Sequence, residues 1–278
     1  MEEFFMNGVQ NNDLSAIAKQ IRYYTIDEIA TLGVGHIGGS LSIADLLAVL
    51  YFSEMNIDPQ NPKMEDRDRL VVSKGHAGPV VYATLALKGY FPLEMLHTLN
   101  KPNTTLPSHC DMLKTPGVDM TAGSLGQGIS CAVGMAKAAK IMQKDCYIYC
   151  IIGDGESQEG QVWEALMAAS HLGLDNLIIF LDYNHMQIDG TTDNIMNIDK
   201  PADRFASFGF DVYDIDGHDI DAIQNSIHSA KTKKGVPSIV VMNTVKGKGV
   251  SFVEAAKVDC HSMTFTEEQK QQALAELV

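Results

Sequence analysis

A carboxylate and an amide follow two predicted strands at a spacing that suits a metal–phosphate site. The apolar run 147–152 is typical of a buried strand, and Gly153-Asp154-Gly155 follows it directly. A second apolar run, 176–182, leads into Asn184. The two polar residues are about 30 residues apart, the usual length of one strand–helix–strand unit. Because neighbouring parallel strands end at the same edge of a sheet, Asp154 and Asn184 are expected to meet there.

Carboxylate, amide and carbonyl oxygens are hard ligands. They suit Mg²⁺ or Ca²⁺ that bridges a diphosphate, and they do not suit a soft metal. The glycines on either side of Asp154 let the backbone approach a phosphate closely. Gly-Asp-Gly alone is common in turns, so the informative feature is its place between two strands, the second of which ends near an Asn.

The elements that must position these residues alternate along the chain. This alternation predicts an α/β fold: a single domain over residues 1–278, with a parallel sheet that carries helices on both faces. Asn12 or Asp13 is expected to cap the first helix, and Ser42 with Asp45 resembles a capping box. We predict strands over 69–73, 147–152, 176–182 and 238–245, and helices over 43–52, 80–88, 128–142, 161–172, 220–230 and 267–277.

Composition excludes several classes of partner. The 278 residues carry 21 Lys and Arg against 35 Asp and Glu, a formal net charge of −14, which argues against binding to nucleic acid or to an anionic membrane surface. No apolar run approaches the ~18 residues of a spanning helix. The start of the chain lacks the features of a signal peptide. With five scattered cysteines, the sequence predicts a cytoplasmic protein.

The segments GDGESQEG and LDYNHMQIDG together resemble the thiamine diphosphate motif, and the resemblance is closest to transketolases. Further segments agree in the same order along the chain, at 35–51, 73–90, 106–130 and 243–252. The resemblance implies the diphosphate-type domain of the thiamine diphosphate-binding fold. It also implies transfer of a two-carbon glycolaldehyde unit from a ketose or ketose phosphate donor to an aldose acceptor.

The resemblance implies roles for individual residues. The metal, Mg²⁺ or Ca²⁺, would be held by Asp154, Asn184 and the carbonyl of Met186. Thiamine diphosphate would be bound by residues at its diphosphate, its aminopyrimidine and its thiazolium ring: His76, Gly123, Leu125, Gly155, Glu159, Asn184 and Ile188. Among these, Glu159 resembles a buried carboxylate that links two active sites across the interface between subunits.

Three histidines are implied as catalytic: His36 and His109 facing the sugar hydroxyls, and His261 near the diphosphate and the donor. The sequence departs from the family pattern beside two of them. Cys110 stands where a proline often follows, and Cys260 and Ser262 flank His261 where the family has an aromatic residue and a glycine.

The resemblance covers only the diphosphate-binding part of the family. It therefore implies a partner, a C-terminal transketolase subunit that supplies the aminopyrimidine-binding domain and its glutamate. An α₂β₂ heterotetramer acting on sugar phosphates is expected, and the chain alone is expected to be inactive.

Three alternatives remain open from the sequence. One is the α subunit of a 2-oxo-acid dehydrogenase. Another is a zinc site built from His109-Cys110 and Cys260-His261. The third is a non-catalytic subunit with a degenerate site.

Overall fold

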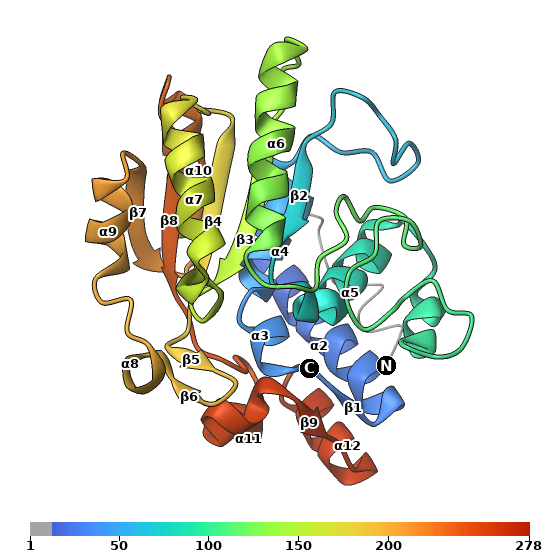
Figure 1. Cartoon of the computed structure of the whole chain (residues 1–278). Helices are drawn as coiled ribbons and strands as arrows, with labels where there is room; N and C mark the ends of the chain where they lie inside the picture. Colours follow the sequence, from blue (N-terminus) through green and yellow to red (C-terminus); the bar gives the residue numbers. More distant parts are fainter. Residues whose placement is uncertain (1–12) are drawn as a thin grey trace.

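The computed structural model describes residues 13–278, and its centre is a five-stranded parallel sheet (Figure 1). The strand order is β2-β3-β4-β8-β7. Gly153, the last residue of β3, lies opposite Asp182 of β4, so the residues that follow both strands leave the sheet at one edge. The strands are β2 (Arg69–Val72), β3 (Ile148–Gly153), β4 (Leu177–Tyr183), β7 (Asp211–Asp216) and β8 (Ser238–Asn243).

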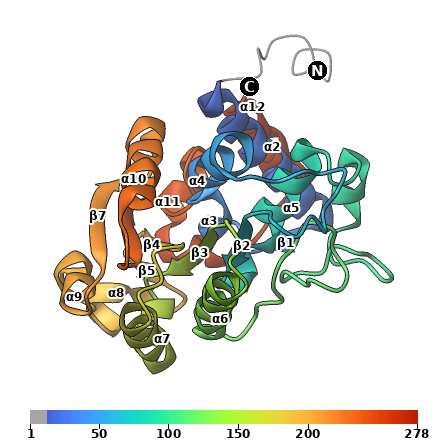
Figure 2. The same ribbon diagram turned by 90° about the horizontal axis from the view of Figure 1, so that it is seen from above.

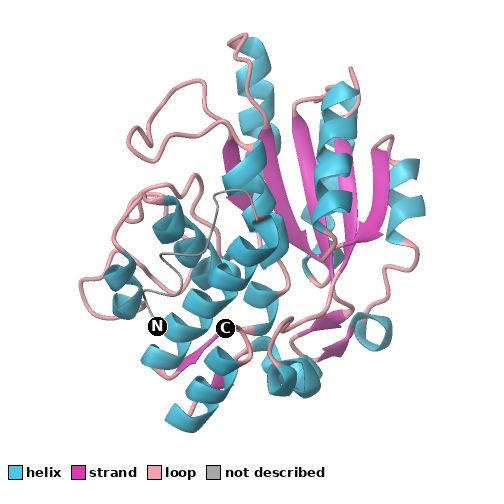
Figure 3. Cartoon of the chain, turned by 180° about the vertical axis from the view of Figure 1, so that it is seen from behind, coloured by secondary structure: helices cyan, strands magenta, loops and turns pink. Residues whose placement is uncertain are grey.

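Helices cover both faces of this sheet, as the sequence predicts (Figures 2 and 3). Alternate strand residues enter two separate cores: Tyr149 and Phe180 belong to the larger one, Cys150 and Ile179 to the smaller one. The larger core contains residues from α2 (Leu14–Leu32), α4 (Ala44–Val49), α5 (Gly78–Lys88), α10 (Ile220–Thr232) and α12 (Glu267–Ala275). The smaller core contains residues from α6 (Gln127–Ile141), α7 (Gly160–His171) and α9 (Pro201–Ser207).

The fold also contains short strands, helices and turns outside the main sheet. In the described part of the chain, two antiparallel pairs lie outside the main sheet: β1 (Val34–Gly35) with β9 (Met263–Thr264), and β5 (Met186–Gln187) with β6 (Gly190–Thr191). Within residues 13–278, the remaining helices are α3 (Gly38–Leu41), α8 (Thr192–Ile195) and α11 (Ser251–Ala256). The remaining turns are the π-helical η1 (Leu50–Glu54) and the 3₁₀ turns η2 (Gly75–Ala77), η3 (Leu93–Thr98), η4 (Glu156–Gln158) and η5 (Lys257–His261). None of the helices within residues 13–278 has the length and apolar character needed to cross a membrane.

Local chemistry explains where the first helix begins and ends. The Asp13 carboxylate accepts from the N–H groups of Ser15 and Ala16, at 3.0 and 3.2 Å, so it satisfies backbone donors that α2 leaves free. Gly33 ends the helix with φ of 94°, a left-handed conformation that glycine adopts without strain. The cap predicted at Asp13 is confirmed, and Asn12 lies outside the described residues.

The predicted capping box at Ser42 and Asp45 is wrong. The Ser42 hydroxyl donates to Asp182 at 2.7 Å, and Asp45 pairs with Arg22, with Nη1 and Oδ1 3.0 Å apart. Within the described chain, α4 begins at Ala44 without a side-chain cap. Both side chains are buried, and their hydrogen bonds to charged partners from distant segments outweigh a local bond to the start of the helix.

Candidate active site

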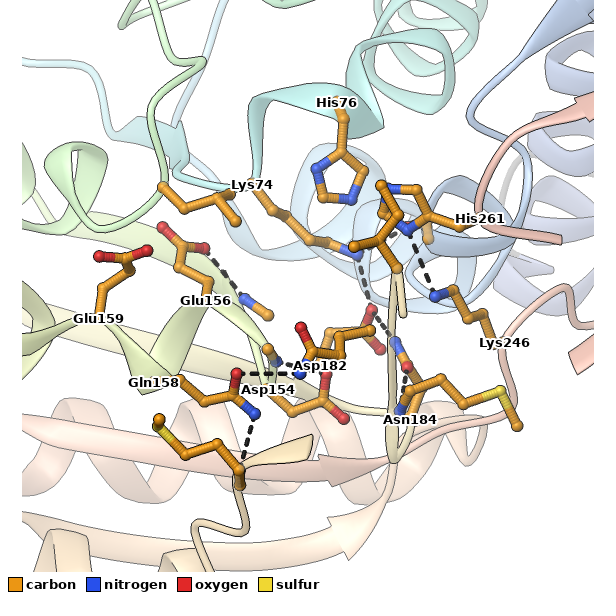
Figure 4. A pocket seen from close by; sticks show the side chains of 18 residues that line it. Lys74, His76, Asp154, Glu156, Gln158, Glu159, Asp182, Asn184, Lys246 and His261 are labelled. Carbon is orange, nitrogen blue, oxygen red and sulfur yellow. Dashed lines mark hydrogen bonds and ion pairs between the residues drawn. The ribbon is translucent and has the colours of Figure 1, made fainter. Parts of the chain in front are cut away.

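A cavity of ≈ 390 Å³ opens where β3 and β4 end (Figure 4). Its wall is formed by the turn after β3, the loop after β4, η2 and residues near the end of the chain. Nine of the residues named from the sequence line it: His76, Leu125, Asp154, Gly155, Glu159, Asn184, Met186, Ile188 and His261. The structure therefore brings together most of the predicted site.

Glu156 fixes the turn that carries Asp154. Its buried carboxylate accepts from the N–H groups of Gly126 and Gly153, at 2.8 and 3.1 Å, and from the Ser73 hydroxyl. These bonds join the end of β2, the start of α6 and the end of β3 at one point. Burial raises the pKa of Glu156 although each of these bonds opposes the rise. Sequence analysis treated Glu156 only as part of the motif and missed this structural role.

Asp154 is only 2% exposed, and its two oxygens differ. Oδ1 accepts from the Gly155 N–H at 2.8 Å, whereas Oδ2 is buried with no hydrogen-bond partner among residues 13–278. Burial, and then the nearby charge of Asp182, raise the pKa of Asp154 to about 7. A buried carboxylate oxygen without a partner fits a cation, because a bound ion compensates the lost hydration.

Asn184 supplies an amide oxygen on the wall of the same cavity. Its Oδ1 accepts from the Met186 N–H at 3.1 Å, and its Nδ2 donates to Asp182 at 3.0 Å. The bond to Asp182 fixes which end of the amide faces the loop. The predicted oxygen set of Asp154, Asn184 and the Met186 carbonyl therefore fits a hard divalent cation.

Asp182 and Lys74 form a buried ion pair at the floor of the cavity. Lys74 Nζ lies 2.6 Å from Asp182 Oδ2 and donates to the Gly39 carbonyl, also at 2.6 Å. Asp182 additionally accepts from the hydroxyls of Ser42 and Thr244. Burial would raise the pKa of Asp182, but Lys74 and these hydrogen bonds hold it below its ordinary value. Sequence analysis did not identify this pair, although both residues lie in segments that it quoted.

Four histidines cluster at the cavity: His76 and His261 line it, whereas His36 and His109 are not part of its wall. The ring of His36 lies 5.5 Å from that of His76, 5.6 Å from that of His109 and 5.4 Å from that of His261, measured between centroids. Burial is the largest cause that lowers the pKa of all four. For His261, burial and then the nearby charge of Lys246 bring the pKa to about 4. The cluster therefore presents neutral imidazoles at pH 7, and these can accept protons.

Lys246 adds a second ammonium group to the cavity wall. Its Nζ lies 3.4 Å from Nδ1 of His261, and the residue is 3% exposed. Burial lowers the pKa of Lys246. With Lys74, it gives the cavity two cations that complement an anionic ligand such as a diphosphate. Sequence analysis quoted the segment 243–252, which contains Lys246, but gave this residue no role and so missed its place in the site.

The remaining predicted residues take less enclosed positions. Gly123 is exposed and is not part of the cavity wall. Ile188 lines the cavity with 63% of its surface exposed. Glu159 is also exposed in this single chain, so its burial at an interface between subunits stays a prediction.

The zinc alternative gains no support from the cysteines. Cys110 and Cys260 are both packed in the larger core. No group of three or more His, Cys, Asp or Glu side chains within residues 13–278 is arranged to hold a metal ion.

Comparison with known proteins identifies the family. Residues 14–277 match the family described as the transketolase, thiamine diphosphate binding domain. The chain is 56% identical over 268 residues to 6-deoxy-6-sulfo-D-fructose transketolase subunit SqwG of Clostridium sp. (strain MSTE9), covering 96% of this chain and 97% of that protein. It is 36% identical over 269 residues to one of the subunits of the apulose-4-phosphate transketolase of Phocaeicola vulgatus, covering 97% and 95%.

Among solved structures, the transketolase from Leishmania mexicana superposes with a TM-score of 0.90 at 31% identity. The match covers 95% of this chain but only 41% of that transketolase, whereas the two relatives named as subunits are covered almost completely. These similarities confirm the predicted α/β fold and favour a transketolase subunit over the 2-oxo-acid dehydrogenase alternative. The chain belongs to the transketolase family and comprises its thiamine diphosphate-binding domain.

Proposed function

We propose that this chain is the thiamine diphosphate-binding subunit of a two-subunit transketolase. Two observations together carry the proposal. The chain matches transketolase subunits over almost their full length, and its cavity contains a carboxylate oxygen, Asp154 Oδ2, that has no partner within residues 13–278 and fits a divalent cation. The reaction is transfer of a two-carbon ketol unit from a ketose to an aldose. The partner is a C-terminal subunit that completes the cofactor site, in an α₂β₂ assembly located in the cytoplasm.

Asp154, Asn184 and the Met186 carbonyl would hold Mg²⁺, and Ca²⁺ is the alternative ion. Gly155, His76, His261 and the two lysines would surround the diphosphate, while Gly123, Leu125 and Ile188 would contact the rings. Thiamine diphosphate supplies, when bound, a carbon nucleophile that also accepts the electrons released when a carbon–carbon bond breaks. The protein binds and orients this group and excludes water around it.

His36 and His109 would move protons at the substrate hydroxyls. Their lowered pKa values leave both imidazoles neutral at pH 7, the form required of a proton acceptor. Changing either to Ala is expected to lower turnover by roughly 10²–10⁴-fold, with a smaller effect on cofactor affinity. A variant that keeps wild-type turnover on the true donor would assign that histidine a structural role.

We further propose 6-deoxy-6-sulfo-D-fructose as the donor. The support is 56% identity, over almost the entire length of both chains, to a subunit named for that sugar. The second relative, at 36%, is named for apulose 4-phosphate and makes that sugar the first competitor to test.

The test is a donor comparison with the two purified subunits, Mg²⁺ and thiamine diphosphate. Ketol transfer is measured from 6-deoxy-6-sulfo-D-fructose, apulose 4-phosphate, a pentose phosphate and pyruvate. The highest kcat/KM is expected for the sulfosugar. Preference for another ketose would change the donor alone, whereas turnover of pyruvate without ketol transfer would overturn the proposed function.

A further inference from the structure

The hairpin that carries two proposed cofactor contacts is a small, separate element. Met186 and Gln187 of β5 pair with Thr191 and Gly190 of β6, and within the described residues this pair is not hydrogen-bonded to the main sheet. A two-stranded hairpin has marginal stability in water. The backbone bond from the Thr192 N–H to the His185 carbonyl, at 3.0 Å, closes the base of the hairpin but does not join it to the rest of the cavity.

β5 packs against η5, and two glutamine side chains join the hairpin to the turn after β3. Gln187 Nε2 donates to Gln158 Oε1 at 3.2 Å, and Gln158 Nε2 donates to the Met196 carbonyl at 2.7 Å. Figure 4 shows Gln158 with these two interactions at the cavity wall. Because Gln158 belongs to η4, the two bonds join the turn after β3, the hairpin and the segment after α8. A primary amide is needed at position 158, since the side chain must accept one bond and donate the other.

The hairpin and the turn are also in close approach. A Cβ atom placed on Gly155 would lie 2.9 Å from Cβ of Gln187, closer than two such carbons can come. The proposed metal ligands are divided between these two segments, with Asp154 on the turn and the Met186 carbonyl on the hairpin. A shift of the hairpin therefore separates groups that must act on one ion.

We propose that Gln158 and Gln187 form an amide clasp: they are positioning residues that hold the hairpin closed over the turn and so set how tightly the metal and cofactor are retained. The cofactor part of this proposal depends on the proposed function. The closure of the hairpin depends only on the contacts described above.

Hydrogen–deuterium exchange on the chain without cofactor tests the closure. The variants are Gln158→Met, Gln187→Met and the double variant, because Met keeps the length of Gln without its amide. Gln224→Met is the matched control, since Gln224 lies on α10 away from the cavity and donates to Ser53 at 3.0 Å. Faster exchange confined to 185–196 is expected in both single variants, with little further change in the double variant. Unchanged exchange in that segment, or faster exchange throughout the chain, overturns the clasp.

Cofactor titration of the two-subunit complex tests retention. At a fixed Mg²⁺ concentration, the Kd for thiamine diphosphate is expected to rise roughly 3- to 30-fold in the single variants, as for the loss of one or two hydrogen bonds. At saturating cofactor, kcat of the glutamine variants is expected to stay near the wild-type value. The control Gln224→Met is expected to keep both the wild-type Kd and the wild-type kcat. Wild-type Kd in both glutamine variants contradicts the retention role. If the wild-type complex itself fails to bind thiamine diphosphate, the proposed function fails, and the exchange experiment still decides the closure of the hairpin.

Discussion

Asp154 and Asp182 are buried carboxylates within one cavity, and their surroundings give them opposite properties. Asp182 is surrounded by donors and the Lys74 ammonium, so its charge is already compensated. Asp154 keeps an unpartnered oxygen and a pKa raised to about 7, so its charge is compensated only when a cation arrives. These surroundings support a structural role for Asp182 and the proposed metal-ligand role for Asp154.

The first prediction concerns Asp154. Asp154→Ala is expected to abolish Mg²⁺-dependent binding of thiamine diphosphate and to leave the circular dichroism spectrum and melting temperature close to wild type. In the wild type, protons compete with the metal below the raised pKa. Apparent Mg²⁺ affinity should therefore fall by roughly tenfold per pH unit below about 7. Isothermal titration at pH 6, 7 and 8 measures both effects, and unchanged cofactor affinity in the variant would remove Asp154 from the metal site.

The second prediction concerns Glu28, a carboxyl group of α2 that the proposed function does not use. Glu28 is fully buried, and neither of its carboxyl oxygens has a hydrogen-bond partner within residues 13–278. Burial, and then the charge of Asp27, raise its pKa well above the ordinary value. Glu28→Met is expected to increase the free energy of unfolding by about 1–3 kcal/mol, because it removes a buried polar group that lacks partners.

The gain from Glu28→Met should also depend on pH. The folded state keeps the Glu28 proton at pH values where the unfolded state has lost it, so this residue lowers the stability of the wild type as pH rises above its ordinary pKa. Urea denaturation at pH 5 and pH 8 should therefore show the larger gain at pH 8. A variant that is less stable than wild type at both pH values would show that Glu28 has a partner that stabilises it.

At the scale of elements, hydrophobic periodicity predicts most of the sheet and its covering helices. The strands expected at 69–73, 147–152, 176–182 and 238–245 correspond to β2, β3, β4 and β8 with shifts of one or two residues. Hydrophobic periodicity does not predict β7, a half-exposed edge strand in which three aspartates stand among Val212, Tyr213 and Ile215. The two-residue strands of the β5–β6 hairpin are too short for periodicity to mark them.

In the candidate site too, some residues can be predicted from the sequence and others cannot. The Gly-Asp-Gly turn and Asn184 follow strands, so their meeting can be predicted from topology alone. The Lys74–Asp182 pair joins residues 108 positions apart, and no local pattern records such a contact. Ser42 shows the same limit: its sequence context predicts a helix cap, yet it donates to a carboxylate 140 positions away.

The third prediction concerns the Lys74–Asp182 ion pair, which links the end of β2 to the end of β4. Lys74→Met leaves Asp182 buried without its counter-ion and is expected to lower the free energy of unfolding by about 3–5 kcal/mol. Adding Asp182→Asn should restore part of this loss, because the neutral amide still accepts from Ser42 and Thr244. A double-mutant cycle by urea denaturation measures the coupling. Additive losses in the double variant would mean that the two charges do not stabilise each other.

At the scale of the molecule, apolar side chains remain exposed at the cavity. Ile188 and Met196 line it with 63% and 58% of their surfaces exposed, and elsewhere Leu113 is 88% exposed on the long loop between η3 and α6. Apolar surface of this kind commonly marks a protein–protein contact. It supports the proposed partner subunit.

The fourth prediction concerns assembly. The purified chain alone is expected to lack ketol transfer, and activity is expected to appear when the C-terminal subunit is added. Native mass spectrometry should then find two copies of each subunit. Full activity from this polypeptide, with mass spectrometry showing that no partner is present, would refute the two-subunit enzyme.

The two edges of the central sheet limit how the molecule can associate. β7 carries Asp211, Asp214 and Asp216 among its six residues, and the opposite edge, β2, is only four residues long. Charged and very short edge strands are poor templates for pairing with the backbone of another chain. Addition of a strand from another chain to either edge is therefore unfavourable. At high concentration, or next to a newly synthesised copy, the protein should contact other chains through its side chains and not through the backbone of its sheet. Complementarity of shape and charge then determines which chain binds.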